Sequence, residues 1–322
     1  SGISGLGNEA VTLSDTSLAA TELNTLDGNT TGAVNAATVT TLTGTAATAN
    51  TAYASSGISG LGNEAVTLSD TSLATTVLNT LDGNTTGAVN AATVTTLTGT
   101  AATANTAYAS SGISGLGNEA VTLSDTSLAA DVLNTLDGNT TGAVNAATVT
   151  TLTGTYSDVN TSYTANTAST ITGLGNEAVA LSDLSISASN LSSIDGLTTG
   201  DVTTSAITIT GTYSEINTVY TASGIDGLGD EAITASGTLT VAQANTLDGY
   251  TTGVVTATIS DTTSTTLASL TGTGNAYTIT VGSTTTAAAD LNTIDAATTV
   301  SVTATAVTTL TGTAAAANTA YA

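Results

Sequence analysis

The sequence predicts a repeat β-solenoid, similar to a parallel β-helix, with about twelve coils of roughly 27 residues and a short helix or turn in each. The first reason is exact repetition, because residues 1–13 return unchanged at residues 56–68 and 111–123. The second is a column of β-branched residues that recurs twice in each 55-residue period. The third is a column of asparagines at nearly the same spacing.

The β-branched column predicts one short strand in each coil. Most of its members are followed by Thr, and a buried branched residue beside an outward hydroxyl is typical of a strand. Twelve such strands, one coil apart, would pair in a parallel ladder with the branched residues buried. The members of the column are Val11, Val39, Val66, Val94, Val121, Val149, Val179, Ile207, Ile233, Ile259, Ile279 and Val307.

The asparagine column predicts a structural ladder. An amide side chain both donates and accepts hydrogen bonds, so it can satisfy backbone groups that a corner leaves unpaired. Ser192 and Ala268 occupy the two positions of the column that lack Asn. The expected ladder residues are Asn24, Asn50, Asn79, Asn105, Asn134, Asn160, Asn217, Asn245, Asn292 and Asn318.

Short helices are expected between the two columns. The segments Thr155–Asp158 and Thr212–Glu215 both have the pattern of a capping box, which begins a helix. Gly28, Gly83, Gly138, Gly196 and Gly249 are expected to end helices in the left-handed conformation. The repeat is less regular after residue 222, so we expect one or two coils there to lack a full helix.

The domain organisation follows from the repeat. An independent domain of 55 residues, without Cys or metal-binding His, would bury too little surface to offset its chain entropy. We therefore expect one continuous solenoid over residues 1–322, in repeats 1–55, 56–110, 111–168 and 169–222 followed by diverged repeats in 223–322. Because residue 1 begins a repeat and Tyr321-Ala322 closes one, the chain has the character of a slice from a longer array.

The composition excludes several classes of function. The 322 residues contain 24 acids and no Lys, Arg or His, giving a formal net charge of −24. Nucleic acids and anionic membranes are unsuitable partners, since both require basic residues, and no apolar run suits membrane insertion. A hydroxyl nucleophile would have no His or Lys as base, and acids that recur in every repeat are not one special catalytic pair. We expect no enzyme activity and no cofactor.

Calcium is the one cation that the residue types suit, through carboxylate and amide oxygens. The candidate ligands are Glu9, Asp27, Glu64, Asp82, Glu119 and Asp137. Tight turns and helix ends use the same residue types, so a purely structural role is the alternative. Asn29-Thr30-Thr31 and its copies have the form of glycosylation sites, and glycans or divalent cations are therefore candidate partners.

Residues 23–32 (Leu-Asn-Thr-Leu-Asp-Gly-Asn-Thr-Thr-Gly) and 42–55 (Leu-Thr-Gly-Thr-Ala-Ala-Thr-Ala-Asn-Thr-Ala-Tyr-Ala-Ser) carry a resemblance over the whole chain. They resemble the giant Thr/Ala/Gly-rich repeat proteins on the surface of marine unicellular cyanobacteria, a group that includes the surface protein needed for non-flagellar swimming. The resemblance implies a secreted structural product and no catalytic residue.

We therefore expect a structural extracellular repeat protein that forms a fibre, filament or surface coat and supports adhesion or motility. The expected partner is a second copy, bound head to tail through the open strand edges. The alternatives are a phage fibre protein and an ice-binding or polysaccharide-binding adhesin.

Overall fold

The computed structural model describes residues 3–322, so the first two residues of repeat 1–55 lie outside the described residues. It has an α/β repeat fold with parallel strands in several sheets. The chain divides into two units, one made of Ser1–Leu152 and Asn160–Leu174 and the other of Thr153–Val159 and Gly175–Ala322. Strand β14 (Thr151–Gly154) and helix α6 (Tyr156–Ala168) contribute residues to both.

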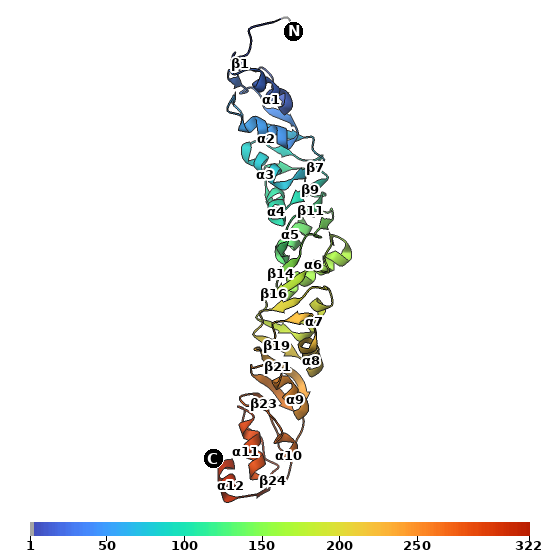
Figure 1. Cartoon of the computed structure of the whole chain (residues 1–322), viewed down its shortest axis with the longest axis vertical. Helices are drawn as coiled ribbons and strands as arrows, with labels where there is room; N and C mark the ends of the chain where they lie inside the picture. The colour runs from blue at the N-terminus through green and yellow to red at the C-terminus, as the bar shows by residue number, and fades with distance from the viewer. Residues whose placement is uncertain (1–2) are drawn as a thin grey trace. The chain divides into compact units, whose positions relative to one another are not determined.

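The first unit alternates short strands with helices of 9 or 10 residues (Figure 1). We call one helix together with the strands that precede it a half-repeat. The helices are α1 (Ala20–Asn29), α2 (Ala46–Ala54), α3 (Thr75–Asn84), α4 (Ala101–Ala109) and α5 (Ala130–Asn139). The strands are β1 (Val11–Thr12), β2 (Ser17–Ala19), β3 (Val34–Asn35), β4 (Thr41–Gly44), β5 (Ile58–Ser59), β6 (Ala65–Leu68), β7 (Ser72–Ala74), β8 (Val89–Asn90), β9 (Thr96–Gly99), β10 (Ile113–Ser114), β11 (Ala120–Leu123), β12 (Ser127–Ala129), β13 (Val144–Asn145) and β15 (Ile171–Thr172).

Strand pairing in this unit links each half-repeat to its neighbours. The sheets have the orders β1-β3-β5, β2-β4-β6-β8-β10 and β7-β9-β11-β13-β15, and every pair is parallel. From the half-repeat of α2 onward, half-repeats with two strands alternate with half-repeats that have three. The middle strand of a set of three, such as β6, pairs with β4 of the preceding half-repeat and β8 of the following one. The single ladder of twelve strands expected from the sequence is therefore wrong.

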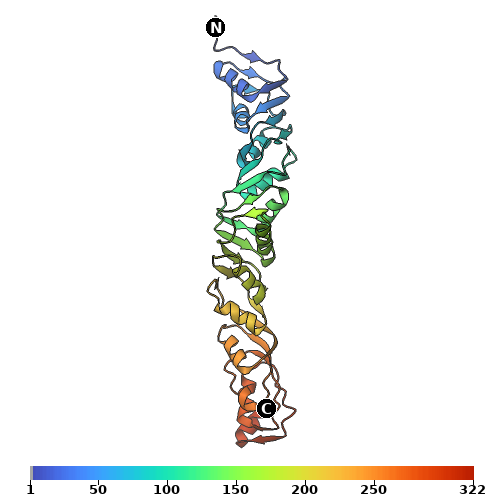
Figure 2. The ribbon, with the colours of Figure 1, turned by 90° about the vertical axis from the view of Figure 1, so that its right-hand side faces the viewer.

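The core of the first unit lies between the strands and the stacked helices. Leu42 and Leu97 of the strands, and Leu23, Leu78 and Leu133 of the helices, are all fully buried. Helices α2 and α4 present only Ala to this core, and such small side chains allow the neighbouring helices to approach closely. Figure 2 shows the same arrangement from the side, with strands and helices in successive half-repeats.

The second unit continues the alternation with less regular spacing. Strands β16, β18 and β20 pair in that order, β17-β19-β21-β22-β23 form a five-stranded sheet, and β24 pairs with β25. Helix α10 has only 4 residues, which confirms that a late half-repeat lacks a full helix. The elements are β16 (Ala178–Leu181), β17 (Ser185–Ser187), α7 (Ala188–Asp195), β18 (Val202–Thr204), β19 (Thr208–Gly211), α8 (Tyr213–Thr221), β20 (Ile225–Asp226), β21 (Ala232–Leu239), α9 (Val241–Asp248), β22 (Val255–Ile259), α10 (Ser264–Leu267), β23 (Ala276–Thr278), β24 (Thr285–Ala287), α11 (Ala288–Ala296), β25 (Thr309–Thr311) and α12 (Ala314–Ala320).

The β-branched column is only partly buried as predicted. Val66, Val121, Val179, Ile233 and Ile259 are buried within strands, whereas Val39, Val94 and Val149 are buried just before a strand. The prediction that Ile207 is buried is wrong, since 65% of this residue is exposed. The reason is the register of the strand. The backbone amide of Ile207 donates to a carbonyl of the preceding half-repeat, as the amide of Thr40 does, so Ile207 corresponds to Thr40. The buried position of Val39 is therefore occupied by Ala206.

The helix ends also differ from expectation. Helix α1 continues through Gly28 to Asn29, and Gly196 and Gly249 follow their helices with φ of −72° and −71°. The prediction that these glycines end helices in the left-handed conformation is therefore wrong. The capping box Thr212–Glu215 is confirmed, and Thr240 with Gln243 forms a second one.

Candidate functional site

The most regular polar feature is a turn that buries a glutamate, which we call the glutamate turn: residues 60–64, 115–119, 173–177 and 227–231. In the first of these, Oε2 of Glu64 accepts hydrogen bonds from the backbone amides of Gly62 at 2.8 Å and Asn63 at 3.2 Å. The hydroxyl of Tyr53, in the preceding helix, donates to the same oxygen at 3.0 Å. The carboxylate has no exposed surface.

The other glutamate turns share most of these donors, and Glu177 accepts from the amides of Gly175 and Asn176. Oε2 of Glu119 accepts from Gly117 at 2.8 Å and from the Tyr108 hydroxyl at 2.9 Å, and Oε2 of Glu231 accepts from the Tyr220 hydroxyl at 2.8 Å. Backbone amides thus serve where other proteins use Lys or Arg. Hydrogen bonds to an ionised acceptor are stronger than neutral ones, which helps to offset the cost of burying a charge.

Glycine and threonine make the turn possible. Gly60 and Gly62 have φ of 88° and 133°, a conformation that favours glycine. A Cβ at Gly87 would lie 2.2 Å from the carbonyl oxygen of Glu64, so the two backbones can approach only because Gly87 has no side chain. The hydroxyl of Thr85 donates to that carbonyl oxygen at 2.7 Å. The Asn-Thr-Thr-Gly motif therefore holds the preceding glutamate turn in place.

The tyrosines of these turns are half-buried. Burial, followed by the influence of Glu64 and Glu119, raises the pKa of the Tyr53 and Tyr108 hydroxyls well above the ordinary value of 10.0. Burial likewise raises the pKa of Tyr220, whose hydroxyl donates to Glu231. The phenols therefore remain neutral donors to the carboxylates.

A second set of acids caps helices of the preceding half-repeat. Oδ2 of Asp70 accepts from the amide of Ala46, the first residue of α2, at 2.8 Å. Asp125 does the same for Ala101 at 2.8 Å. A helix begins with unpaired N–H groups and a partial positive charge, so a carboxylate there is favourable. In the second unit, Asp183 accepts from Tyr156 and Asp261 from Val241.

In the first unit, the asparagine column links each helix from α1 to α4 to the helix that follows it. Nδ2 of Asn24 donates to the carbonyl of Thr48 at 2.9 Å, Asn50 to Val77 at 3.0 Å, and Asn79 to Thr103 at 2.9 Å. The acceptor in each case is the third residue of the following helix. Two further members do likewise, since Asn105 donates to Val132 and Asn292 to Ala316. Asn245 donates to the carbonyl of Ser269, just beyond the end of α10. Of the remaining members, Asn134 accepts from Ser162 and Asn217 accepts from Tyr250. The last two members of the column are Asn160 and Asn318.

A further hydrogen bond to the asparagine column is kept in the diverged repeats, where a tyrosine replaces an asparagine as the donor. Nδ2 of Asn84 donates to Oδ1 of Asn50 at 2.9 Å in the first unit. Tyr250 follows a glycine as Asn84 does, and its hydroxyl donates to Oδ1 of Asn217 at 2.7 Å. The ring of Tyr250 also stacks on Tyr220 with centroids 5.1 Å apart.

The calcium candidates are distributed among separate contacts. Oε2 of Glu9 accepts from the amides of Gly7 and Asn8, which lowers its pKa, while Glu64 and Glu119 lie in their turns. Asp27 accepts from Ser55 at 2.6 Å, Asp82 from Ser110 at 2.7 Å and Asp137 from Thr170 at 3.2 Å. Within residues 3–322, no three acidic side chains gather as a metal site requires.

Sequence reasoning missed the capping aspartates and the tyrosine partners of the glutamates. The signal for the aspartates was present, because Asp15, Asp70 and Asp125 recur at the 55-residue period. The pairing of Tyr53 with Glu64 had no sequence signal of its own, since every residue of a repeat recurs with that period.

The outward side chains of the strands form no continuous threonine file. Thr43 lies between Ala19 and Thr67, and Thr67 lies beside Asn90. In the part of the chain that the structure describes, no helix is long and apolar enough to span a membrane.

Comparison with known proteins gives no relative: the chain matches no protein-family model, no curated protein and no solved structure.

Proposed function

We propose that the half-repeats form one continuous β-solenoid and that the protein is a structural, non-catalytic component of an extracellular fibre, filament or surface coat. One observation carries the proposal: the recurring polar side chains bond one half-repeat to the next. Tyr53 and Glu64, Asp70 and Ala46, and Asn50 and Val77 all join neighbouring half-repeats. Such contacts resist separation of the half-repeats along the chain.

An extracellular place suits the composition. The chain has no Lys or Arg for trypsin-like proteases to recognise and no Cys to oxidise. The resemblance of the repeats to surface proteins of marine unicellular cyanobacteria supports the same place and a use in adhesion or motility. Antibodies raised against the chain should label the surface of intact source cells, and labelling only after lysis would contradict this part of the proposal.

Stretching single molecules tests the structural role. With the chain held at its two ends, we expect force peaks whose extensions are multiples of about 90 to 100 Å, the extended length of roughly 27 residues. A variant with Tyr53→Phe, Tyr108→Phe and Tyr220→Phe loses three contacts between half-repeats and should give lower peaks. Extension without any force peak would overturn the structural role.

A further inference from the structure

The sequence contains six Asp-Gly pairs, and one of them differs from the others in its place in the fold. Five pairs lie at the ends of helices, whereas Asp226-Gly227 joins strand β20 to the glutamate turn 227–231. The residues that precede the other glutamate turns are Ser59, Ser114 and Thr172. The five pairs at helix ends, which we call the helical pairs, are Asp27-Gly28, Asp82-Gly83, Asp137-Gly138, Asp195-Gly196 and Asp248-Gly249.

An Asp-Gly pair can rearrange without an enzyme. The backbone nitrogen of the glycine bonds to Cγ of the aspartate, and the OH of the protonated carboxyl group leaves as water with the amide proton, which closes a succinimide ring. Water then opens the ring at one of its two carbonyls. Opening at Cγ returns aspartate, and opening at the α-carbonyl gives isoaspartate, in which the backbone runs through the former side chain. Glycine favours ring closure because it has no Cβ to obstruct it.

The helical pairs are protected against this rearrangement. An amide inside a helix donates to the carbonyl four residues earlier, so its nitrogen is not free to attack. The amide of Gly196 donates to the carbonyl of Ser192 at 3.1 Å. Gly249 donates in the same way to Asn245 at 3.1 Å. Side-chain donors also hold four of the five carboxylates, which are those of Asp27, Asp82, Asp137 and Asp248.

Asp226-Gly227 lacks both kinds of protection. Strand β20 is the edge of its sheet and pairs only with β18, through Ile225 and Asp226. Within the described residues, neither the Asp226 carboxylate nor the Gly227 amide has a hydrogen-bond partner. Both residues are exposed, so water reaches the reacting atoms.

The turn at Gly227 also leaves room for the ring. In the other complete glutamate turns, a Cβ on the first glycine would lie 2.7 Å from a backbone nitrogen of the preceding half-repeat, as it would for Gly60 and Ala37. At Gly227, the nearest atom to such a Cβ is the carbonyl oxygen of Thr204, at 3.8 Å. The backbone at Gly227 is therefore not held by a close contact of this kind.

We propose that Asp226 of the folded chain rearranges spontaneously to isoaspartate, while the aspartates of the five helical pairs persist. The reaction needs only water, which is released when the ring closes and consumed when it opens. Isoaspartate adds one atom to the backbone directly before the glutamate turn 227–231.

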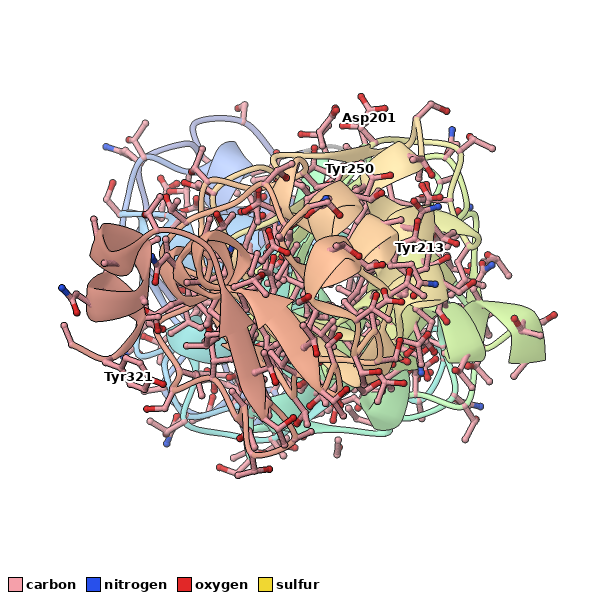
Figure 3. All side chains as sticks on the ribbon, turned by 90° about the horizontal axis from the view of Figure 1, so that it is seen from below. Asp201, Tyr213, Tyr250 and Tyr321 are labelled. Carbon is pink, nitrogen blue, oxygen red and sulfur yellow. The ribbon has the colours of Figure 1, made fainter. Side chains whose placement is uncertain are left out.

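The added backbone atom lies where the turn holds two half-repeats together. The amide of Gly229 donates to Oε2 of Glu231 at 2.9 Å, and the hydroxyl of Tyr220, in the preceding helix, donates to the same oxygen at 2.8 Å. Tyr250, labelled in Figure 3, stacks its ring on Tyr220. A longer chain between β20 and the turn displaces Glu231 from Tyr220. The rearrangement thus loosens one particular contact of the array as the chain ages.

Peptide mapping by mass spectrometry tests where the rearrangement occurs. The folded chain is incubated at neutral pH in water enriched in heavy oxygen, which labels an aspartate each time its ring is hydrolysed. We expect the label at Asp226 to exceed that at any helical pair by about tenfold or more, because a helical amide reacts only when its helix opens locally. In denaturant this preference should disappear. Equal labelling of all six pairs in the folded chain, or a preference for Asp226 that persists in denaturant, overturns the proposal.

Two variants test the effect on the turn. Asp226→Ser carries the residue found at Ser59 and Ser114 and cannot form the ring. Asp226→Glu keeps the charge but would have to close a larger ring. After the same incubation in ordinary water, the thermal midpoint of the parent chain should fall in step with its isoaspartate content, and the midpoints of both variants should stay constant. Equal losses in the parent and both variants overturn the claim that isoaspartate loosens this contact.

Discussion

At the scale of single residues, the chain shows how acids can be buried without any cationic side chain. Glu64 accepts hydrogen bonds from two backbone amides and from a tyrosine hydroxyl, and Asp70 accepts one from the first backbone amide of a helix. These donors carry only partial charges, so each acid depends on a fixed geometry rather than on a mobile counter-ion. The tyrosines complete that geometry.

The raised pKa values of Tyr53, Tyr108 and Tyr220 predict a loss of stability in alkali. Unfolded tyrosine loses its proton near the ordinary pKa of 10.0, whereas the folded phenols hold theirs to higher pH. The unfolded state therefore binds fewer protons above pH 10, and stability falls as pH rises from there. Denaturant midpoints at pH 8 to 12 measure this. The triple phenylalanine variant should show a shallower fall, and an identical pH profile would contradict the role of these hydroxyls.

Calcium dependence is tested by thermal unfolding. Because Glu64 and Glu119 already accept backbone and tyrosine donors, we expect equal thermal midpoints in chelator and in millimolar calcium. A ligand that binds only the folded state must raise stability. A calcium-dependent rise in the midpoint, absent in magnesium, would restore Asp27 and Asp82 as candidate ligands.

At the scale of helices and strands, an asparagine side chain ties each helix from α1 to α4 to the helix that follows it. Asn79 donates from α3 to the carbonyl of Thr103 in α4. Most of the strands have only two to four residues, so they add little cohesion alone and depend on being packed against such helices.

Replacing Asn79 tests this link between helices. Asn79→Ala removes a partly buried hydrogen bond and should lower the free energy of unfolding by about 1 kcal/mol. Asn63 has an exposed side chain, so Asn63→Ala is the matched control and should leave the denaturant midpoint unchanged. If the two variants were equally stable, the asparagine contact would contribute nothing to cohesion.

The elements also show what could be predicted from sequence. The asparagine column and the Thr212 capping box were visible because one residue type or one short motif defines each. Strands such as β3 and β8 were missed, since two residues carry no recognisable alternation. Ile207 was predicted to be buried because it is the more hydrophobic of two neighbouring residues. The residue that is in fact buried, Ala206, is too small and too weakly hydrophobic to indicate this from the sequence.

At the scale of the whole molecule, the repeat makes stability local. Within the first unit, strands pair only between consecutive half-repeats, as β4 does with β2 and β6. The free energy of such an array is approximately a sum over half-repeats and the contacts between neighbours. Removing one whole period should therefore leave every remaining contact in place.

Deleting residues 56–110 tests this directly. The deletion joins Ser55 to Ser111, which restores the local sequence of the natural junction, and it sets Glu119 where Glu64 receives the Tyr53 hydroxyl. We expect a cooperatively folded protein with unchanged helicity per residue by circular dichroism. Deleting residues 70–110 instead joins β6 to β10 without an intervening helix, so it removes the helix contacts on both sides and should broaden or abolish the unfolding transition. If the deletion of a full period were as damaging as the shorter one, the half-repeats would depend on contacts beyond their neighbours, and the additive account of this fold would fail.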